Sequence, residues 1–157
     1  MKSISAENLH DLAAQARAVP RLRKNLNLHD QLEDPIQRLL NALQPGTYIR
    51  PHRHPPGVWE TFILLQGRCA ILLFDDAGCI SERLELSADG TLIAEIPTDT
   101  WHSVVALSPA TLVLEIKPGP YVPGVFTDWS PEETSPQAQD CLRWLEQAQP
   151  GQSYVHD

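Results

Sequence analysis

Three of the six histidines stand at positions where they could bind a metal ion together with a nearby carboxylate. His52 and His54 are separated by one residue, so in a strand their side chains point to the same face. Glu60 opens the next apolar run, and His102 lies in a separate run much further along the chain. Imidazole and carboxylate groups are ligands for Fe, Mn, Ni, Co and Zn. The set therefore indicates a metal site, with the alternative that the two close histidines are a solvated loop pair and Glu60 an ordinary surface carboxylate.

Two further polar residues stand just before these histidines. If the strand runs from Gly46, Tyr48 and Arg50 share the face of His52 by parity, and the Tyr48 phenol is then a group that could transfer a proton. An arginine that faces a barrel interior needs an anionic partner. Arg50 is therefore either a clamp for a carboxylate or phosphate of a substrate, or one half of an internal salt bridge, for example with Glu115.

A second group of candidates follows in the last apolar run and in the loop after it. Glu115 lies between apolar neighbours. It is either a pocket carboxylate that moves a proton near the metal or, with Lys117, part of a solvent-facing pair on an ordinary amphipathic strand. Tyr121, in a loop rich in proline and glycine, either lines the mouth of the pocket or packs under the loop. We predict that Glu115 and Tyr48 are catalytic, and that the substrate contacts Arg50, Lys117 and Tyr121.

Helices are expected only near the two ends of the chain. Ser5–Val19 carries apolar residues at helical spacing, with Ser5 as its N-cap. Ser135–Ala148 has a similar apolar stripe, with Ser135 as N-cap and Pro136 at the first helical position. The pattern predicts one helix on each side of the fold that lies between them.

Between these helices, seven short runs bounded by turn residues predict strands. They are Gly46–Pro51, Trp59–Leu65, Arg68–Phe74, Ile80–Leu86, Leu92–Ile96, Trp101–Leu107 and Leu112–Lys117. The stretch Pro35–Leu43 is instead interpreted as a short helical turn, in which Arg38 and Asn41 make structural hydrogen bonds. Short strands at this spacing, with no helix expected among the seven, favour an all-β sandwich or barrel over alternating strands and helices.

Length, charge and cysteine content restrict the class of protein. A chain of 157 residues suits one domain, and its net charge of −8 argues against nucleic acid or an anionic membrane surface as the partner. No apolar stretch has the length of a membrane span or the character of a signal peptide. The three cysteines match no zinc-binding spacing, so we expect a cytoplasmic protein with free thiols.

The spacing around the candidate ligands resembles the first motif of the cupin superfamily. The stretch consists of a glycine, five residues, His52-Arg53-His54, five residues, Glu60, six residues and a second glycine. Only the gap between His54 and Glu60 is one residue longer than in the family. The residues before His102 resemble the second cupin motif less closely, with Asp99 in place of a glycine.

One branch of the superfamily, the WbuC-type cupin-fold metalloproteins, resembles this chain over a longer stretch. The similarity lies in residues 25–29, 38–54, 101–103, 115–121 and 129–133. It implies a small cupin barrel, a double-stranded β-helix or jelly-roll, with the N- and C-terminal helices packed outside. Residues 1–20 are then the N-terminal helix, residues 21–130 the barrel, and residues 131–157 the C-terminal helix and tail of one domain.

The resemblance also implies a metal centre. One divalent transition metal per chain, Fe, Mn, Zn or Ni, would be bound by His52, His54, Glu60 and His102. Cupins commonly pair through their sheets, so a homodimer is expected. The WbuC name comes from genes of O-antigen clusters, which suggests bacterial surface-polysaccharide metabolism.

Two classes of function agree with these features. The first is a metal-dependent enzyme that acts on a small polar or anionic, sugar-derived molecule, as an isomerase, an epimerase or an oxygenase. The second is a non-catalytic, metal-bearing binding or accessory protein. We favour the enzyme, because proton-transfer groups are expected beside the metal and the chain shows no second domain through which a ligand signal could be passed on.

Overall fold

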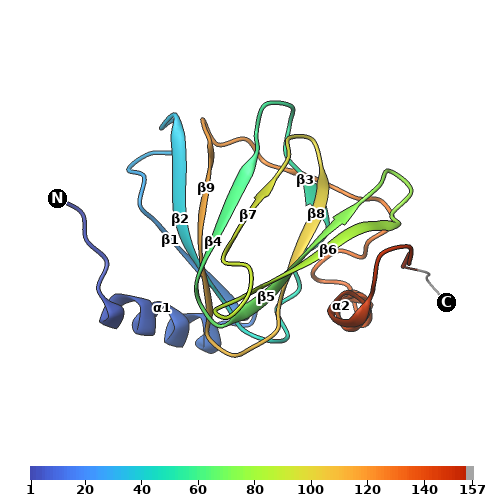
Figure 1. Ribbon diagram of the computed structural model, residues 1–157, viewed down its shortest axis with the longest axis horizontal. Coiled ribbons are helices and arrows are strands. Elements are labelled where there is room, and N and C mark those ends of the chain that lie inside the picture. The colour runs from blue at the N-terminus through green and yellow to red at the C-terminus, as the bar shows by residue number, and fades with distance from the viewer. Residues whose placement is uncertain (155–157) are drawn as a thin grey trace.

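The computed structural model describes residues 1–154, which form ten strands between two helices (Figure 1). The helices are α1 (Ala6–Ala18) and α2 (Ala138–Gln147). One sheet contains, in spatial order, β1 (Arg23–Asn27), β2 (Ile36–Leu43), β9 (Thr111–Pro118), β4 (Glu60–Gln66) and β7 (Ile93–Ile96). The other contains β10 (Val125–Phe126), β3 (His52–Arg53), β8 (Trp101–Ala106), β5 (Arg68–Phe74) and β6 (Ile80–Ser87). Residues 155–157 of the predicted tail lie outside the described residues.

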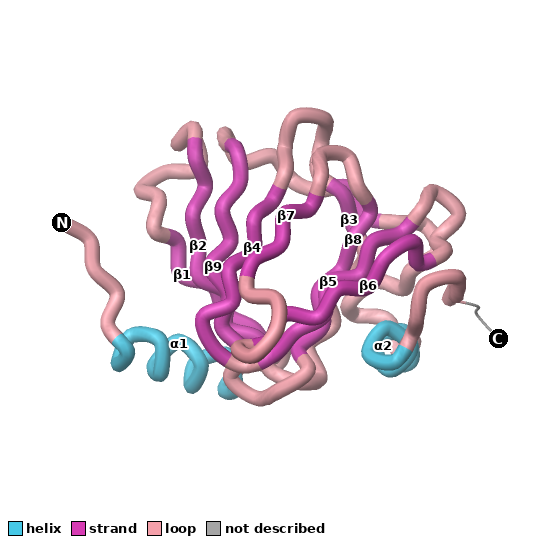
Figure 2. Tube along the Cα trace, in the orientation of Figure 1, coloured by secondary structure: helices cyan, strands magenta, loops and turns pink. Residues whose placement is uncertain are grey.

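The two sheets face each other (Figure 2). Apolar side chains form a buried layer between them. The named pairs of strands are all antiparallel. The layer contains side chains from both sheets, among them Leu43, Phe62, Ile71, Val104 and Val113. Because burial of apolar surface is the main favourable term in folding, this layer holds the barrel closed. The predicted all-β barrel with flanking helices is confirmed.

Each helix covers the outer face of one sheet. α1 adds Leu12 to a cluster with Leu40 and Leu112 of the first sheet, and α2 adds Leu145 to a cluster with Leu72 of the second. β5 is therefore buried on both faces, which explains why its sequence is a continuous apolar run rather than an alternating one. Among the described residues, no helix is both long enough and apolar enough to cross a membrane.

The two helices differ in how their N-termini are capped. Ser5 caps α1 as predicted, because its hydroxyl accepts a hydrogen bond from the Asn8 N–H while the Asn8 side chain accepts one from the Ser5 N–H. α2 begins at Ala138, later than predicted. The Ser135 hydroxyl accepts the N–H of Gln137 within a turn, so it does not cap the helix.

Two of the predicted segments have a different secondary structure in the fold. Residues 36–43 form β2 rather than a helical turn, because they pair along their whole length with β9. Residues 46–51 form a loop that belongs to neither sheet of the described structure, and strand pairing begins only at His52. β1 and β10 were not predicted either. The other predicted strands, which correspond to β4 to β9, are confirmed with small shifts at their ends.

Arg83 of β6 holds the C-terminal end of α2. Its guanidinium donates hydrogen bonds to the carbonyl oxygens of Leu145 at 2.9 Å, Glu146 at 3.0 Å and Ala148 at 3.2 Å. The last carbonyls of a helix have no partner within the helix, and the last turn of α2 carries no basic residue of its own among the described residues. The arginine therefore supplies the donors that this helix end lacks.

We expect Arg83→Met to lower the free energy of unfolding by about 2 kcal/mol, because buried helix carbonyls lose their donors. Denaturant titration followed by circular dichroism measures the change. Arg143→Met is the matched control, since Arg143 is an exposed residue of the same helix whose ion pair is with Asp140. Equal losses in the two variants would contradict the role assigned to Arg83.

Candidate metal centre

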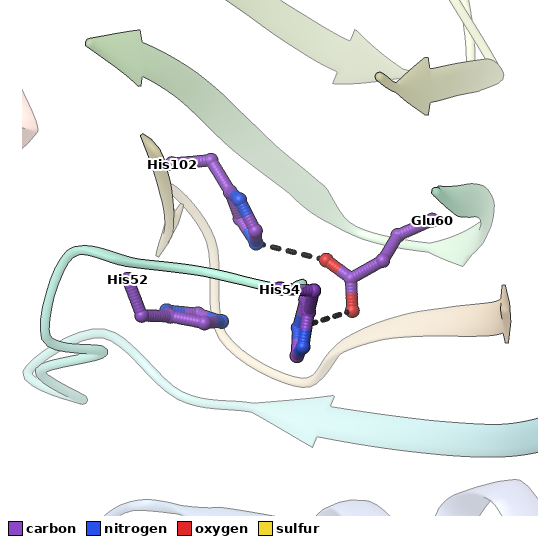
Figure 3. Close-up of side chains that lie close together, drawn as sticks. All are labelled: His52, His54, Glu60 and His102. Atoms are coloured by element: carbon purple, nitrogen blue, oxygen red, sulfur yellow. Dashed lines mark ion pairs between the residues drawn. The ribbon is translucent and has the colours of Figure 1, made fainter. Parts of the chain in front are cut away.

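The four ligands proposed from the sequence converge between the two sheets (Figure 3). The ladder of one sheet places His52 of β3 opposite His102 of β8, and His54 follows β3 directly. Glu60 is the first residue of β4 in the other sheet. One ligand atom from each of the four residues lies within 4.8 Å of the others. The closure of the two sheets therefore brings together residues that are distant along the chain.

Two of the three imidazoles are oriented by backbone carbonyls. His52 Nδ1 lies 2.9 Å from the carbonyl oxygen of Arg50, and His102 Nδ1 lies 2.9 Å from that of Thr100. A carbonyl can only accept, so both rings carry a proton on Nδ1, and in the neutral ring the lone pair of Nε2 is then free to bind a metal. Burial, with the neighbouring His102, lowers the pKa of His52 to about 3. His52 is therefore neutral, which is the form that binds metals.

The Glu60 carboxylate faces two of these rings at short range. Glu60 Oε2 lies 2.8 Å from His102 Nε2, and Glu60 Oε1 lies 3.0 Å from His54 Nε2. Within the described residues, neither Glu60 Oε2 nor His54 Nε2 has a hydrogen-bond partner. In the neutral form of His102 with its proton on Nδ1, lone pairs lie on both sides of the 2.8 Å contact, and a cation between Nε2 and Oε2 would bind both.

The same distances fit a metal ion. Neighbouring ligand atoms at right angles, each about 2.1 Å from one ion, are about 3 Å apart. Burial alone would raise the pKa of Glu60, but the close contacts with His102 and His54 and the charge of the Lys117 ammonium outweigh it and hold that pKa well below its usual range. Three imidazoles and an ionised carboxylate are a donor set for divalent transition metals. The residues present therefore fit such an ion.

A buried network extends from Glu60 to Glu115. Lys117 Nζ lies 2.8 Å from Glu60 Oε1 and 2.7 Å from Glu115 Oε1, and the Asn41 side chain donates to Glu115 Oε2 at 2.7 Å. Burial and the charge of Glu60 raise the pKa of Glu115. For Lys117, burial would lower the pKa, but the two carboxylates outweigh it and raise it. Glu115 and Lys117 thus belong to a buried network rather than to a solvent-facing pair.

The network and the four candidate ligands line one cavity of about 270 Å³. The charged and polar lining residues outside the candidate ligand set are Arg21, Arg23, Asn41, Arg50, Glu115, Lys117, Tyr121 and Glu133. Tyr121 lines the cavity and is 47% exposed, as expected for a residue at its mouth. Sequence reasoning missed Asn41 as a lining residue, because the apolar residues of Ile36–Leu43 do not alternate with polar ones as in a half-buried strand.

Arg50 lines the cavity, and two of its guanidinium nitrogens, Nε and Nη2, bind the chain itself. Its Nη2 donates to the Thr127 carbonyl at 2.7 Å and its Nε to the Ser130 hydroxyl at 3.2 Å, and its guanidinium lies 5.2 Å from the centroid of the Phe126 ring. The predicted role as a clamp for an anion stays a prediction. No salt bridge joins Arg50 to Glu115 among the described residues. Arg50 instead fixes the loop that follows β10.

Tyr48 does not line the cavity. Its hydroxyl donates to the Pro131 carbonyl at 2.9 Å and lies 3.6 Å from Cys141 Sγ, in the apolar cluster under α2. The prediction that it shares the face of His52 is wrong, because that parity holds only in a strand and residues 46–51 form a loop. We therefore withdraw the catalytic role of Tyr48.

We expect Tyr48→Phe to lower the free energy of unfolding by about 1 kcal/mol, because it removes one buried hydrogen bond and leaves the Pro131 carbonyl unpaired. Metal content and ligand binding should not change. Thermal or chemical unfolding and elemental analysis of the same preparation measure both quantities. Loss of metal or of binding at unchanged stability would restore a role for this phenol in the site.

Comparison with solved structures identifies the fold. A cupin 2 domain-containing protein from Halorhodospira halophila has a TM-score of 0.55 and 13% identity, and the match covers 83% of this chain and 85% of that one. TT1209 from Thermus thermophilus has a TM-score of 0.56 and 20% identity, over 75% and 97%. A cupin superfamily protein from Desulfitobacterium hafniense has a TM-score of 0.50 and 17% identity, over 68% and 86%. The predicted cupin fold is thereby confirmed.

Comparison by sequence identifies a family but no activity. No curated protein matches this chain. The model of a domain of unknown function, DUF6016, matches residues 4–86, from the segment before α1 to the second-last residue of β6. Because this match spans more than half of the 157 residues, the chain belongs to the DUF6016 family.

Proposed function

We propose that this protein is a metal-dependent enzyme that acts on a small anionic molecule, with one divalent transition metal per chain bound by His52, His54, Glu60 and His102. The observation that carries the proposal is the convergence of three imidazoles and the buried Glu60 carboxylate, whose ligand atoms all lie within 4.8 Å of one another. When bound, such an ion would polarise a carbonyl or hydroxyl group of the substrate.

The chain's own residues supply the other requirements of such a site. Glu115 is 7% exposed. Lys117 connects it to the candidate ligand Glu60, because the Lys117 ammonium contacts both carboxylates. The Glu115 carboxylate is the group that takes or returns a proton at Oε1 or Oε2. Asn41 and Lys117 hold that carboxylate in one orientation. The surrounding apolar side chains of Leu43 and Val113 exclude water from this end of the cavity.

The charge of the cavity supports an anionic substrate. Four cationic side chains line it against three carboxylates, whereas the whole chain has a net charge of −8. A divalent ion would add to this local excess of positive charge. The volume of about 270 Å³ is near the lower end for small-molecule sites, which suits a small acid or sugar derivative. The resemblance of the sequence to WbuC-type proteins supports a sugar-derived molecule of surface-polysaccharide metabolism.

One observation favours a second candidate, a non-catalytic metal-bearing binding protein. Both oxygens of Glu115 already have partners, Lys117 on Oε1 and Asn41 on Oε2. A general base in this position would have to exchange one of these partners for the substrate. The two candidates differ in whether a molecule that binds in the cavity is also converted.

For the metal, we expect about one transition-metal ion per chain in the purified protein, and its loss in His52→Ala and His102→Ala, because each variant removes one Nε2 ligand. Removal of the ion by a chelator should lower the midpoint of thermal unfolding, since an ion that binds only the folded state stabilises it. Elemental analysis and thermal unfolding measure these effects. His10→Ala, on the exposed face of α1, is the control. Unchanged stoichiometry in both site variants would refute the ligand set.

For the proton transfer, we expect Glu115→Gln to retain the metal and to bind ligands, but to reduce turnover by about 100-fold or more. The substitution keeps the shape of the side chain and removes its basicity. Nucleotide sugars and sugar acids are incubated with the protein, with and without oxygen, and products are identified by mass spectrometry. Glu95→Gln on β7 is the control, because Glu95 does not line the cavity. Binding without conversion of any compound would favour the binding protein.

A further inference from the structure

A second charged cluster lines the same cavity as the candidate metal centre. Arg21 Nε and Nη2 donate to the two carboxylate oxygens of Glu133, at 3.0 and 3.1 Å. Arg23 Nη2 donates to the same carboxylate. One carboxylate thus accepts hydrogen bonds from two guanidinium groups, in the paired geometry by which arginine recognises carboxylates and phosphates. All three residues line the cavity.

Arg23 is held in place independently of Glu133. Its Nη1 donates to the Tyr48 carbonyl at 2.9 Å and lies 3.3 Å from the Thr47 hydroxyl, and its side chain is only 17% exposed. The other guanidinium Nη atom is the one that points to the carboxylate. A guanidinium fixed in this way loses little freedom when it binds an anion, which favours affinity.

The cluster lies toward solvent, and the candidate metal centre lies deeper. The side chains of Arg21 and Glu133 are 64% and 31% exposed, whereas that of Glu60 is 4% exposed. The cavity therefore has a buried end that carries the candidate ligands and a solvent-accessible end that carries the arginines. A small molecule that enters meets the arginines before it reaches the histidines.

We propose that Arg21 and Arg23 form the subsite that binds an acidic group of the ligand, a carboxylate or a phosphate, and that Glu133 occupies this subsite until the ligand displaces it. The inference rests on the proposed function in one respect, that the cavity takes a small anion. It assigns the recognition of that anion to this pair rather than to Arg50, whose Nε and Nη2 are bound to Ser130 and Thr127.

The energetics of the cluster permit the exchange. Ion pairs that are open to solvent contribute little net stability, because both partners are also well solvated when apart. Two cations share one carboxylate here, so the cluster keeps an excess of positive charge. A ligand acid that replaces Glu133 forms similar hydrogen bonds, and Glu133 turns into solvent. If the cluster served only to tie the chain before α2 to β1, Glu133 would affect stability alone and not anion binding.

The test measures the affinity of the full chain for inorganic phosphate and for succinate by calorimetry. Each measurement is made on the protein as purified and again after treatment with a chelator that is then dialysed away. Glu133→Gln should bind these probes about three- to tenfold more tightly than the wild type, and Arg23→Gln at least about tenfold more weakly. Arg21→Gln should also weaken binding. This variant covers the case in which Arg23→Gln does not fold, because the Arg21 side chain bonds only to Glu133 among the described residues.

Glu132→Gln is the matched control, since it changes the same charge at the neighbouring residue, which does not line the cavity. Opposite effects of the glutamate and arginine variants, with the control at the wild-type value, support the subsite. Equal or weaker binding by Glu133→Gln, or wild-type binding by both arginine variants, overturns it. The same order of affinities in the chelator-treated protein separates this inference from the metal site, because the arginine subsite does not depend on the ion.

Discussion

The buried Glu60 carboxylate is the constraint on which the rest of the site depends. Its side chain is 4% exposed, and an ionised carboxylate at that depth is stable only with compensating charge and donors. Lys117 of β9 provides one positive charge from the same sheet, and the imidazoles of His54 and His102 approach from the other side. If the two sheets separated at this point, the carboxylate would keep Lys117 but lose its contacts with both imidazoles. The barrel and the site therefore stabilise each other.

The sequence predicted the residues whose spacing repeats with the period of a strand, and it failed where pairing between distant segments decides the structure. His52 and His54 were identified because they stand two residues apart, and the strand that holds His102 is a clear apolar run. Residues 36–43 form a strand through their ladder with β9, which begins at Thr111. No local sequence pattern predicts that pairing, and the intrinsic propensities of these residues did not exclude a helical turn.

The same limit explains the residues that were misplaced or missed. The prediction that Tyr48 faces the cavity assumes a regular strand from Gly46 onward. The chain forms a loop there instead, and the Tyr48 side chain lies in the apolar cluster under α2. Arg21 and Glu133 are separated by 112 residues, and they meet because the segment between β10 and α2 returns to the start of β1. Such a contact depends on the closure of the whole fold, so it becomes visible only in three dimensions.

The charges along the cavity are divided between its two ends. At the buried end, Lys117 faces both Glu60 and Glu115, so with neutral imidazoles this end has an excess of negative charge, which suits a cation. At the solvent-accessible end, Arg21 and Arg23 face Glu133 alone, so that end has an excess of positive charge, which suits an anion. A divalent ion at the buried end would reverse the sign there, and an anion anchored on the arginines would then be attracted along the full length of the cavity. Binding at the two ends is thereby coupled, and because such coupling is reciprocal, the anion would strengthen metal binding by the factor by which the metal strengthens anion binding.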